Sequence, residues 1–359
     1  MKNQRCIFAY SLILLIFLQI SSCKHEDLTI RKESENYSNL VDYSKNNYNL
    51  TLFHAALQQV GLTDLLRSEG PFTIFAPSNQ AFNELGITNI SDFSKMNKDS
   101  LKRMLNYHII ERRLTFSEVP ANTIDNKYEN LAKLNLFIGK KEIKPCTTCA
   151  LSKNYYVNGA SISNLEMDIP LANGVLNIID KVLKYQPTVQ DILIGNKDYS
   201  YFIQFLKQMG DWDRLAQPQP ITIFAPINDA FIKQGITLEE IKTWDQSNYY
   251  KRFWRVYQVH NHFFLSDMEI FGPLSGSGYY QGAYYRGPIP GDEDYVFGIA
   301  SDPDRTPFYA SFYHSNIRSY FARSKFLPKQ YQDYKADNGI VHTLSELLIL
   351  PKDAIINKN

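Results

Sequence analysis

The chain has 359 residues, which is long enough for two or three domains of ordinary size. Its 38 Lys and Arg residues nearly balance its 37 Asp and Glu residues, so the formal net charge of +1 excludes binding to nucleic acid through bulk charge. Hydrophobic residues make up 44% and charged residues 21%, a globular composition that excludes a disordered chain and a polytopic membrane protein.

The N-terminal segment predicts the compartment. Lys2 and Arg5 precede an apolar run over residues 7–20 that is short for a membrane span, so residues 1–22 are expected to be a signal peptide. The run ends in Ile-Ser-Ser-Cys, which resembles the lipobox of bacterial lipoproteins. In those proteins the cysteine, here Cys23, becomes the first residue and carries acyl chains such as palmitate. The alternative is an ordinary signal peptide with a chance cysteine.

Residues 23–45 are polar and are expected to form a tether. Lys24, rather than Asp, follows the cysteine, which in lipoproteins favours the outer membrane. Glu26-Asp27 resembles the signals that send some lipoproteins to the cell surface. The resemblance therefore implies a protein of the cell envelope that a lipid anchors in the outer membrane, with the periplasmic and the external face both open.

Only two cysteines remain outside the signal and the anchor. Cys146 and Cys149 follow Pro145 in a predicted turn, and in an oxidising compartment they are a candidate disulfide. A redox pair would need a helix N-terminus and a thioredoxin-like context, and a zinc site would need two more ligands. A structural turn or disulfide is the favoured interpretation.

The rest of the chain is internally duplicated. The decapeptide Thr73–Phe82 returns as Thr222–Phe231, 149 residues later, which indicates one supersecondary unit used twice. An apolar stripe of helical period precedes each decapeptide and ends in a glycine suited to a helix C-terminus with positive φ. Thr-Ile-Phe-Ala predicts a short buried strand that the proline ends, and Asn79 or Asn228 is expected to cap the next helix.

Each copy continues with a helix that is expected to run into a strand. In the first copy this strand begins at Tyr107-His108. We align this pair with Val259-His260, which requires an offset three residues larger than the 149 of the decapeptides. Each copy closes on an Asn-Gly turn of expected positive φ and a strand, at Asn173–Leu183 and Asn338–Leu348. These segments lie 165 residues apart, so about 16 extra residues are expected in the second copy, after His260.

The three ordered motifs resemble the fasciclin family and cover nearly all of the mature chain as two tandem domains, expected at residues 46–185 and 187–351. The resemblance implies an α+β fold, with a helical layer packed on a β-sandwich or wedge. It also implies adhesion or ligand binding at cell surfaces or in extracellular matrices, without catalysis or a cofactor. Because Val259 stands where the family often has Tyr, an adhesive role of the Tyr-His pair would fall to Tyr107 and His108.

No motif of a serine hydrolase, a zinc protease or a nucleotide-binding enzyme occurs, so an enzyme is the minority interpretation. His260 and His262 share a face of the predicted strand, but no third metal ligand is identifiable. We therefore expect no metal site, and instead a structural His260 beside a surface His262.

His108 and Asn79 are expected to be fold determinants, with ligand contact as the alternative. A His in the middle of a strand is partly buried, and a buried imidazole needs partners for both nitrogens. Thr73 or Asn79 in the nearby strand-to-helix corner is expected to supply one of them.

The segment after His262 is rich in tyrosine and glycine. Ten of the 24 tyrosines lie there, at positions 279, 280, 284, 285, 295, 309, 313, 320, 331 and 334. Because aromatic rings with a hydroxyl edge suit saccharide or protein surfaces, Tyr279, Tyr280, Tyr284 and Tyr285 are the candidate contacts for an extracellular protein or a glycan. The alternative is that the tyrosines only pair across β-hairpins.

Three classes of function remain. The leading one is a surface-anchored binding or adhesion module. The second is an accessory glycan-binding or assembly lipoprotein of an outer-membrane uptake system, and the third is an enzyme, which a cluster of buried, perturbed carboxylates or histidines in a cleft would favour.

Overall fold

The structure of the chain is a computed structural model that describes residues 37–144, 148–218, 220–271, 284–289, 292–302, 305–314, 320–326, 328 and 331–356. Residues 38–359 form one compact unit. The predicted anchor Cys23, the cysteine Cys146 and the candidate contacts Tyr279 and Tyr280 lie outside the described residues. Within the described ranges, no helix combines the length and the apolar character needed to span a bilayer.

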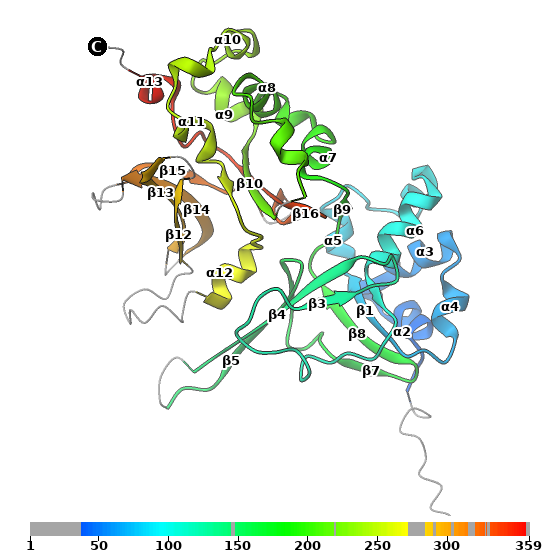
Figure 1. Cartoon of the computed structure of the whole chain (residues 1–359). Coiled ribbons are helices and arrows are strands. Elements are labelled where there is room, and N and C mark those ends of the chain that lie inside the picture. The colour runs from blue at the N-terminus through cyan, green and yellow to red at the C-terminus, as the bar shows by residue number, and fades with distance from the viewer. Residues whose placement is uncertain are drawn as a thin grey trace, which may run out of the picture. The chain divides into compact units, whose positions relative to one another are not determined.

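The first repeat, residues 38–184, combines a group of helices with a long sheet. Its helices are α2 (Leu40–Asn46), α3 (Thr51–Val60), α4 (Thr63–Arg67), α5 (Asn79–Asn83) and α6 (Lys98–Tyr107). Its strands are β1 (Phe72–Pro77), β2 (Ile109–Ile110), β3 (Lys127–Glu129), β4 (Asn135–Ile143), β5 (Ser152–Val157), β6 (Ala160–Ile162), β7 (Ile169–Leu171) and β8 (Gly174–Ile179). They pair in the order β2-β1-β8-β6-β5-β4-β3, and β7 pairs with β8. Figure 1 shows α3, α4 and α6 gathered beside β1 and β8.

The second repeat, residues 187–356, follows the connecting strand β9 (Tyr185–Gln186). Its helices are α7 (Val189–Ile194), α8 (Ser200–Gln208), α9 (Asn228–Ile232), α10 (Leu238–Lys242), α11 (Arg252–Arg255), α12 (Leu265–Phe271) and α13 (Pro351–Ala354). One sheet has the order β11-β10-β17-β16-β9, with β10 (Ile221–Pro226), β11 (Gln258–Val259), β16 (Tyr334–Ala336) and β17 (Gly339–Leu344). A second sheet holds β12 (Tyr284–Ile289), β13 (Asp292–Asp302), β14 (Arg305–His314) and β15 (Tyr320–Lys325) in sequence order.

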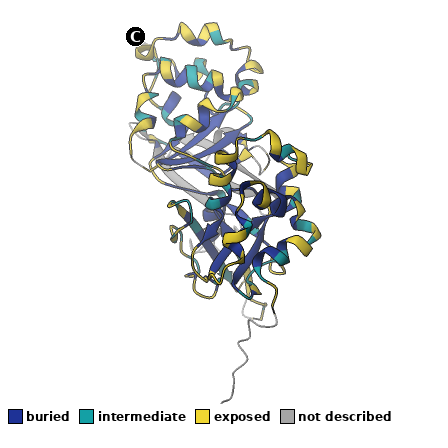
Figure 2. Ribbon diagram, turned by 90° about the vertical axis from the view of Figure 1, so that its right-hand side faces the viewer, coloured by how far each residue is buried: buried dark blue, intermediate teal, exposed yellow. Residues whose placement is uncertain are grey.

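The central strands of the two repeats pair in the same way. β1 lies parallel to β8 and antiparallel to β2, and β10 lies parallel to β17 and antiparallel to β11. Every residue of these four longer strands is buried, whereas the helices that flank them expose their outer faces (Figure 2). In the second repeat the ring of Phe224 in β10 lies 4.5 Å from that of Phe297 in β13, so the two sheets share one core.

The β12–β15 sheet corresponds to the β3–β6 strands of the first repeat. Ile162 of β6 pairs with Ile179, and Phe326, directly after β15, forms a bridge with Leu344 at the equivalent position. The tyrosine-rich segment is thus a longer version of a shared four-stranded element, and not wholly an insertion. Ile299 and Ala310 of this sheet are buried in the core of the repeat.

Glycine serves two different purposes in the repeats. Gly61 ends α3 with a φ of +73° and Gly210 follows α8 with a φ of +63°, as the helical stripes predicted. Gly174 was expected to form a turn of positive φ, and this was wrong. A Cβ on Gly174 would lie 2.2 Å from the backbone oxygen of Phe72, so this glycine allows two parallel strands to approach closely.

The fold begins earlier than we expected. Helix α2 lies almost entirely within the expected tether 23–45, but its Leu40 and Val41 are buried in the core of the first repeat. The side-chain oxygen of Asn173 accepts a hydrogen bond from the Leu40 backbone N–H at 3.0 Å. In the second repeat, Asn338 accepts the same bond from Val189, so α2 is an integral part of the unit.

Candidate functional site

The threonines that open the shared decapeptides fasten a loop to the sheet. The Thr73 hydroxyl donates to the backbone oxygen of Arg112 at 2.7 Å and accepts from the N–H of Leu114 at 2.8 Å. Thr222 makes the same two bonds with Asn261 and Phe263, and neither threonine is exposed.

The decapeptide asparagines stabilise a neighbouring helix, which differs from our expectation. Ser78, not Asn79, caps α5, because its hydroxyl accepts from the Ala81 N–H. The Asn79 side chain instead crosses to the start of α3, where its oxygen accepts from Leu52 N–H and its amide donates to the Tyr48 backbone oxygen. Asn228 repeats this arrangement at the start of α8.

His108 is fully buried at the end of α6, and not in the middle of a strand. Its Nδ1 donates to the backbone oxygen of Met104 at 2.8 Å, and its Nε2 accepts from the Leu183 N–H at 3.0 Å. The expected partners, Thr73 and Asn79, are bonded elsewhere. Burial lowers the pKa of His108 to about 4, which agrees with a neutral ring that donates with one nitrogen and accepts with the other.

The counterpart of His108 in the second repeat is Tyr257, so our alignment with His260 was wrong. The backbone oxygens of His108 and Tyr257 accept equivalent bonds, from Phe75 and Phe224. The Tyr257 hydroxyl accepts from the Leu348 N–H at 2.9 Å, in the position where His108 accepts from Leu183. The offset of 149 residues therefore continues through this helix without a slip.

Tyr107 is also buried, with only 1% of its surface exposed. Its hydroxyl donates to the Asn135 backbone oxygen and accepts from the Asn158 amide at 2.7 Å. The adhesive role that the resemblance implies for Tyr107 and His108 would therefore require the first repeat to open.

His260 and His262 have exchanged the surroundings that we expected. His260 is exposed, and its Nε2 accepts from Arg214, which together with Arg255 pairs with the buried carboxylate of Asp211. His262 is only 8% exposed and packs against Phe137 of the first repeat. β11 ends at Val259, so neither histidine lies on a strand. Among the described residues, no three potential metal ligands come together.

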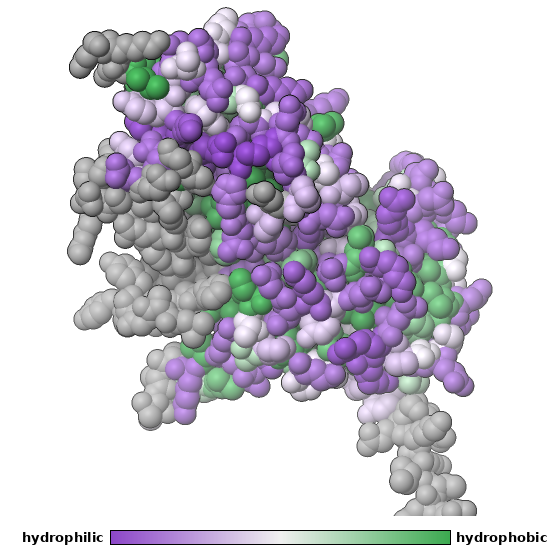
Figure 3. Space-filling view, viewed as in Figure 1, coloured by the Kyte–Doolittle hydropathy of each residue, from purple (hydrophilic) through white to green (hydrophobic). Residues whose placement is uncertain are grey.

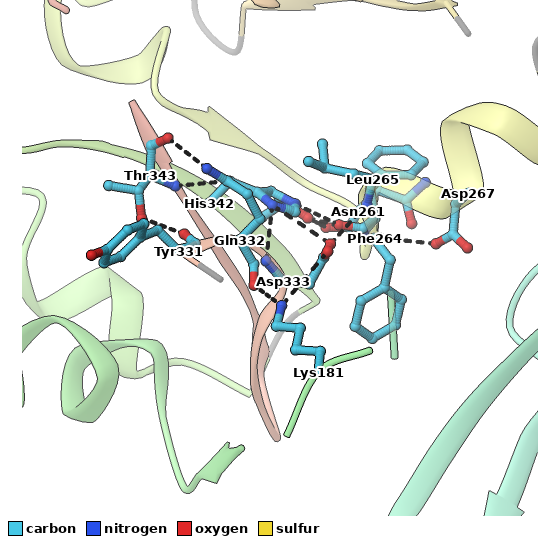
Figure 4. Close-up of polar contacts among 12 residues, drawn as sticks. Lys181, Asn261, Phe264, Leu265, Asp267, Tyr331, Gln332, Asp333, His342 and Thr343 are labelled. Atoms are coloured by element: carbon cyan, nitrogen blue, oxygen red, sulfur yellow. Dashed lines mark hydrogen bonds and ion pairs between the residues drawn. The ribbon is translucent and has the colours of Figure 1, made fainter. Parts of the chain in front are cut away.

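A polar cluster lies where the two repeats meet; we call Lys181, Asp267, Gln332, Asp333 and His342 the junction cluster (Figure 4). The Asp333 carboxylate accepts from the Leu265 N–H at 2.8 Å and lies 3.8 Å from the Lys181 ammonium. Lys181 also donates to the backbone oxygen of Gln332. The Lys181 and Asp333 side chains are 10% and 2% exposed, so this is a buried ion pair between the repeats.

Asp333 has a close equivalent in the first repeat. Both Asp168 and Asp333 have positive φ, and the Asp168 carboxylate accepts from Phe116 N–H as Asp333 does from Leu265. Asn177 accepts from the Asp168 N–H, and His342 accepts from the Asp333 N–H. This aspartate is not among the residues predicted from the sequence, although it stands five residues before the Asn-Gly pair in both copies.

Burial favours the neutral form of two groups of the junction cluster. The Nε2 of His342 donates to the Phe263 backbone oxygen at 2.8 Å, and burial lowers the pKa of this ring. Burial raises the pKa of the Asp267 carboxyl well above its usual range, helped by the nearby negative charges of Asp333 and Asp125. Perturbed groups of this kind also occur in active sites. The pocket that borders Lys181 is lined by no other residue of the junction cluster, and its volume of about 10 Å³ is room for one water molecule.

The remaining predicted residues are less informative. Tyr284 and Tyr285 lie in β12, where Tyr285 pairs with Ile299 and Tyr284 with Ala300. Cys149 is disulfide-bonded, while its predicted partner Cys146 lies outside the described residues.

Comparison with known proteins identifies the scaffold. Residues 48–185 match the fasciclin domain family. Protein sll1483 of Synechocystis is 22% identical over 177 residues, which cover 49% of this chain and 89% of that protein. Human periostin is 25% identical over 203 residues, which cover 56% of this chain but only 22% of periostin.

Among solved structures, a FAS1 domain pair from the insect cell adhesion molecule fasciclin I is similar over 85% of this chain and 97% of that one, with 21% identity and a TM-score of 0.38. The family match to the first repeat, together with the strand pairing and motif contacts that the second repeat shares with it, confirms the predicted fold class, α+β with two tandem fasciclin-like domains.

Proposed function

We propose that this chain is a non-catalytic binding or adhesion module that a lipid on Cys23 holds in the cell envelope. The main support is that the polar residues shared by both repeats are used internally. Thr73 and Asn79, like Thr222 and Asn228, each bind backbone groups of their own repeat. Such residues specify the scaffold, so recognition of an external partner is expected to depend on what differs between the repeats.

The element that differs most is the sheet β12–β15. Each of its strand pairs contains one register shift, and away from these shifts Tyr284, Ala300, Tyr309 and Lys325 are paired in turn across the four strands. Strand pairing of this kind brings residues onto one face of a sheet. A tyrosine-bearing face suits a protein or a glycan ligand, because aromatic rings bury a large area at a small entropic cost.

The helical layer of the second repeat is a less suitable contact surface. In Figure 3 hydrophilic residues cover most of the region of α8, α9 and α10, with only isolated apolar residues between them. Interaction sites are more often marked by contiguous apolar or aromatic patches.

We expect replacement of Tyr279, Tyr280, Tyr284 and Tyr285 by Ser to weaken binding to a ligand found on a glycan and matrix-protein array by about thirtyfold, since an interface anchor contributes about 2 kcal/mol or more. The assay uses the chain from residue 28. Tyr48→Ser is the matched control, because Tyr48 is 89% exposed but lies in the first repeat. Unchanged affinity of a folded quadruple variant would place the contact elsewhere, and unfolding would favour the hairpin-pairing alternative.

Membrane attachment has a separate test. Cys23→Ser should move the exported protein from the membrane fraction to the soluble fraction, because the thiol is the site of lipid attachment in our proposal. Fractionation followed by mass spectrometry measures this. Exported protein that still carries residues 1–22 would contradict the lipoprotein assignment.

A further inference from the structure

His262 occupies an unusual position for a histidine. It lies in the segment between β11 and α12, and its ring packs against Phe137 of the first repeat, with ring centres 4.5 Å apart. The ring of Phe264 contacts the His262 ring edge-on, with ring centres 5.2 Å apart. The side chain is 10% exposed, and neither ring nitrogen has a hydrogen-bond partner among the described residues. A buried polar group without a partner is rare and needs an explanation.

Positive charges surround this histidine. Lys127 of β3 and Lys335 of β16 place their ammonium groups 5.6 and 5.4 Å from the centre of the Phe137 ring. Both lysines disfavour a charge on His262, and so does His342 of β17. A protonated ring would therefore add a third cation to a site that already faces two.

Negative charges do not offset this arrangement. The carboxylate of Asp125 lies 3.8 Å from His262 Nδ1 and is 47% exposed, so water screens it. Asp333 is paired with Lys181, and burial favours the neutral form of Asp267 on α12. Burial, followed by Lys335 and Lys127, lowers the pKa of His262 to about 3.

The contact that His262 makes is one of several that join the repeats. Lys181 pairs with Asp333, and Ile270 of α12 lies so close to Gly139 of β4 that a Cβ there would be 2.8 Å from it. β9 also pairs with β16. These contacts hold the joint while the imidazole is neutral, because a neutral ring fits between the two phenylalanines.

We propose that His262 makes the joint between the two repeats acid-sensitive: its protonation separates the segment after β11 from β3 and β4 of the first repeat. The proposal concerns the geometry of the tandem unit and does not depend on the proposed binding function. A separated joint exposes the ring to water, where an imidazole is protonated below about pH 6.5. Each pH unit below that value therefore favours the separated joint about tenfold, down to about pH 3.

Energy transfer between two dyes tests the proposal. The dyes are attached at Tyr48→Cys and Ile232→Cys, two exposed positions in different repeats, in the chain from residue 28. This chain retains the whole compact unit 38–359. We expect the transfer efficiency to change between pH 6.5 and 3. His262→Phe should move this transition down by at least one pH unit, because Phe keeps the aromatic contact and cannot be protonated.

His260→Gln is the matched control, since His260 is exposed and lies two residues away, and it should leave the transition unchanged. The proposal is overturned if His262→Phe and the parent have the same transition, or if no change in transfer occurs down to pH 3. If His262→Phe does not fold, NMR titration of the unsubstituted chain decides. A His262 resonance that stays neutral to about pH 4 supports the proposal, and a pKa near 6.5 contradicts it.

Discussion

Asp333→Asn should lower the free energy of unfolding by about 3 kcal/mol, because it leaves the Lys181 ammonium buried without its counter-charge. Asn tolerates the positive φ of this position and keeps an oxygen that can accept from Leu265 N–H, so the substitution removes mainly the charge. Urea denaturation of the chain from residue 28 measures the effect.

Asp168→Asn is the matched control for this prediction. Asp168 has the same backbone conformation and accepts the equivalent bond from Phe116, but no lysine lies within ion-pair distance among the described residues. We expect a loss of about 1 kcal/mol or less. Equal losses for the two variants would mean that the ion pair with Lys181 contributes nothing beyond the shared hydrogen bond.

His108→Ala should lower the free energy of unfolding by about 4 kcal/mol. The substitution leaves a cavity in a fully buried site and orphans both the Met104 oxygen and the Leu183 N–H. Tyr257→Phe is the matched change in the second repeat. It should cost only about 1–2 kcal/mol, because it removes a single acceptor, that of Leu348 N–H, and keeps the ring.

The effect of His108→Ala on the free energy of unfolding should depend on pH. Because the pKa of His108 is about 4 in the fold and near 6.5 in the unfolded chain, the unfolded state binds more protons between these values. The stability difference between the parent and His108→Ala should therefore be constant above pH 6.5. It should shrink by about 1.4 kcal/mol per pH unit from pH 6.5 to 4. A pH-independent difference would mean that the ring is solvated in the native state.

His108 and Tyr257 also show why the equivalence of these two positions could not be predicted from the sequence. Tyr107-His108 and Val259-His260 have similar sequences, and aligning them requires an offset that is three residues larger than that of the decapeptides. The sheet pairing decides otherwise, because Thr73 faces Ile110 and Thr222 faces Val259, which keeps the offset at 149. A phenol then replaces an imidazole as acceptor for the same backbone N–H, an exchange that similarity of residue types does not indicate.

Three features follow from the amino-acid sequence alone: the repeat, the buried strands at Thr-Ile-Phe-Ala, and the helix ends at Gly61 and Gly210. These features depend on local preferences and on the period of apolar residues, which neighbouring positions encode. The burial of His262, the exposure of His260 and the pairing of Lys181 with Asp333 become visible only in the folded chain. Local sequence patterns do not encode them, because burial and charge pairing depend on groups far apart in the chain. Phe137 and Lys181 of the first repeat reach residues of the second only after both repeats have folded and packed.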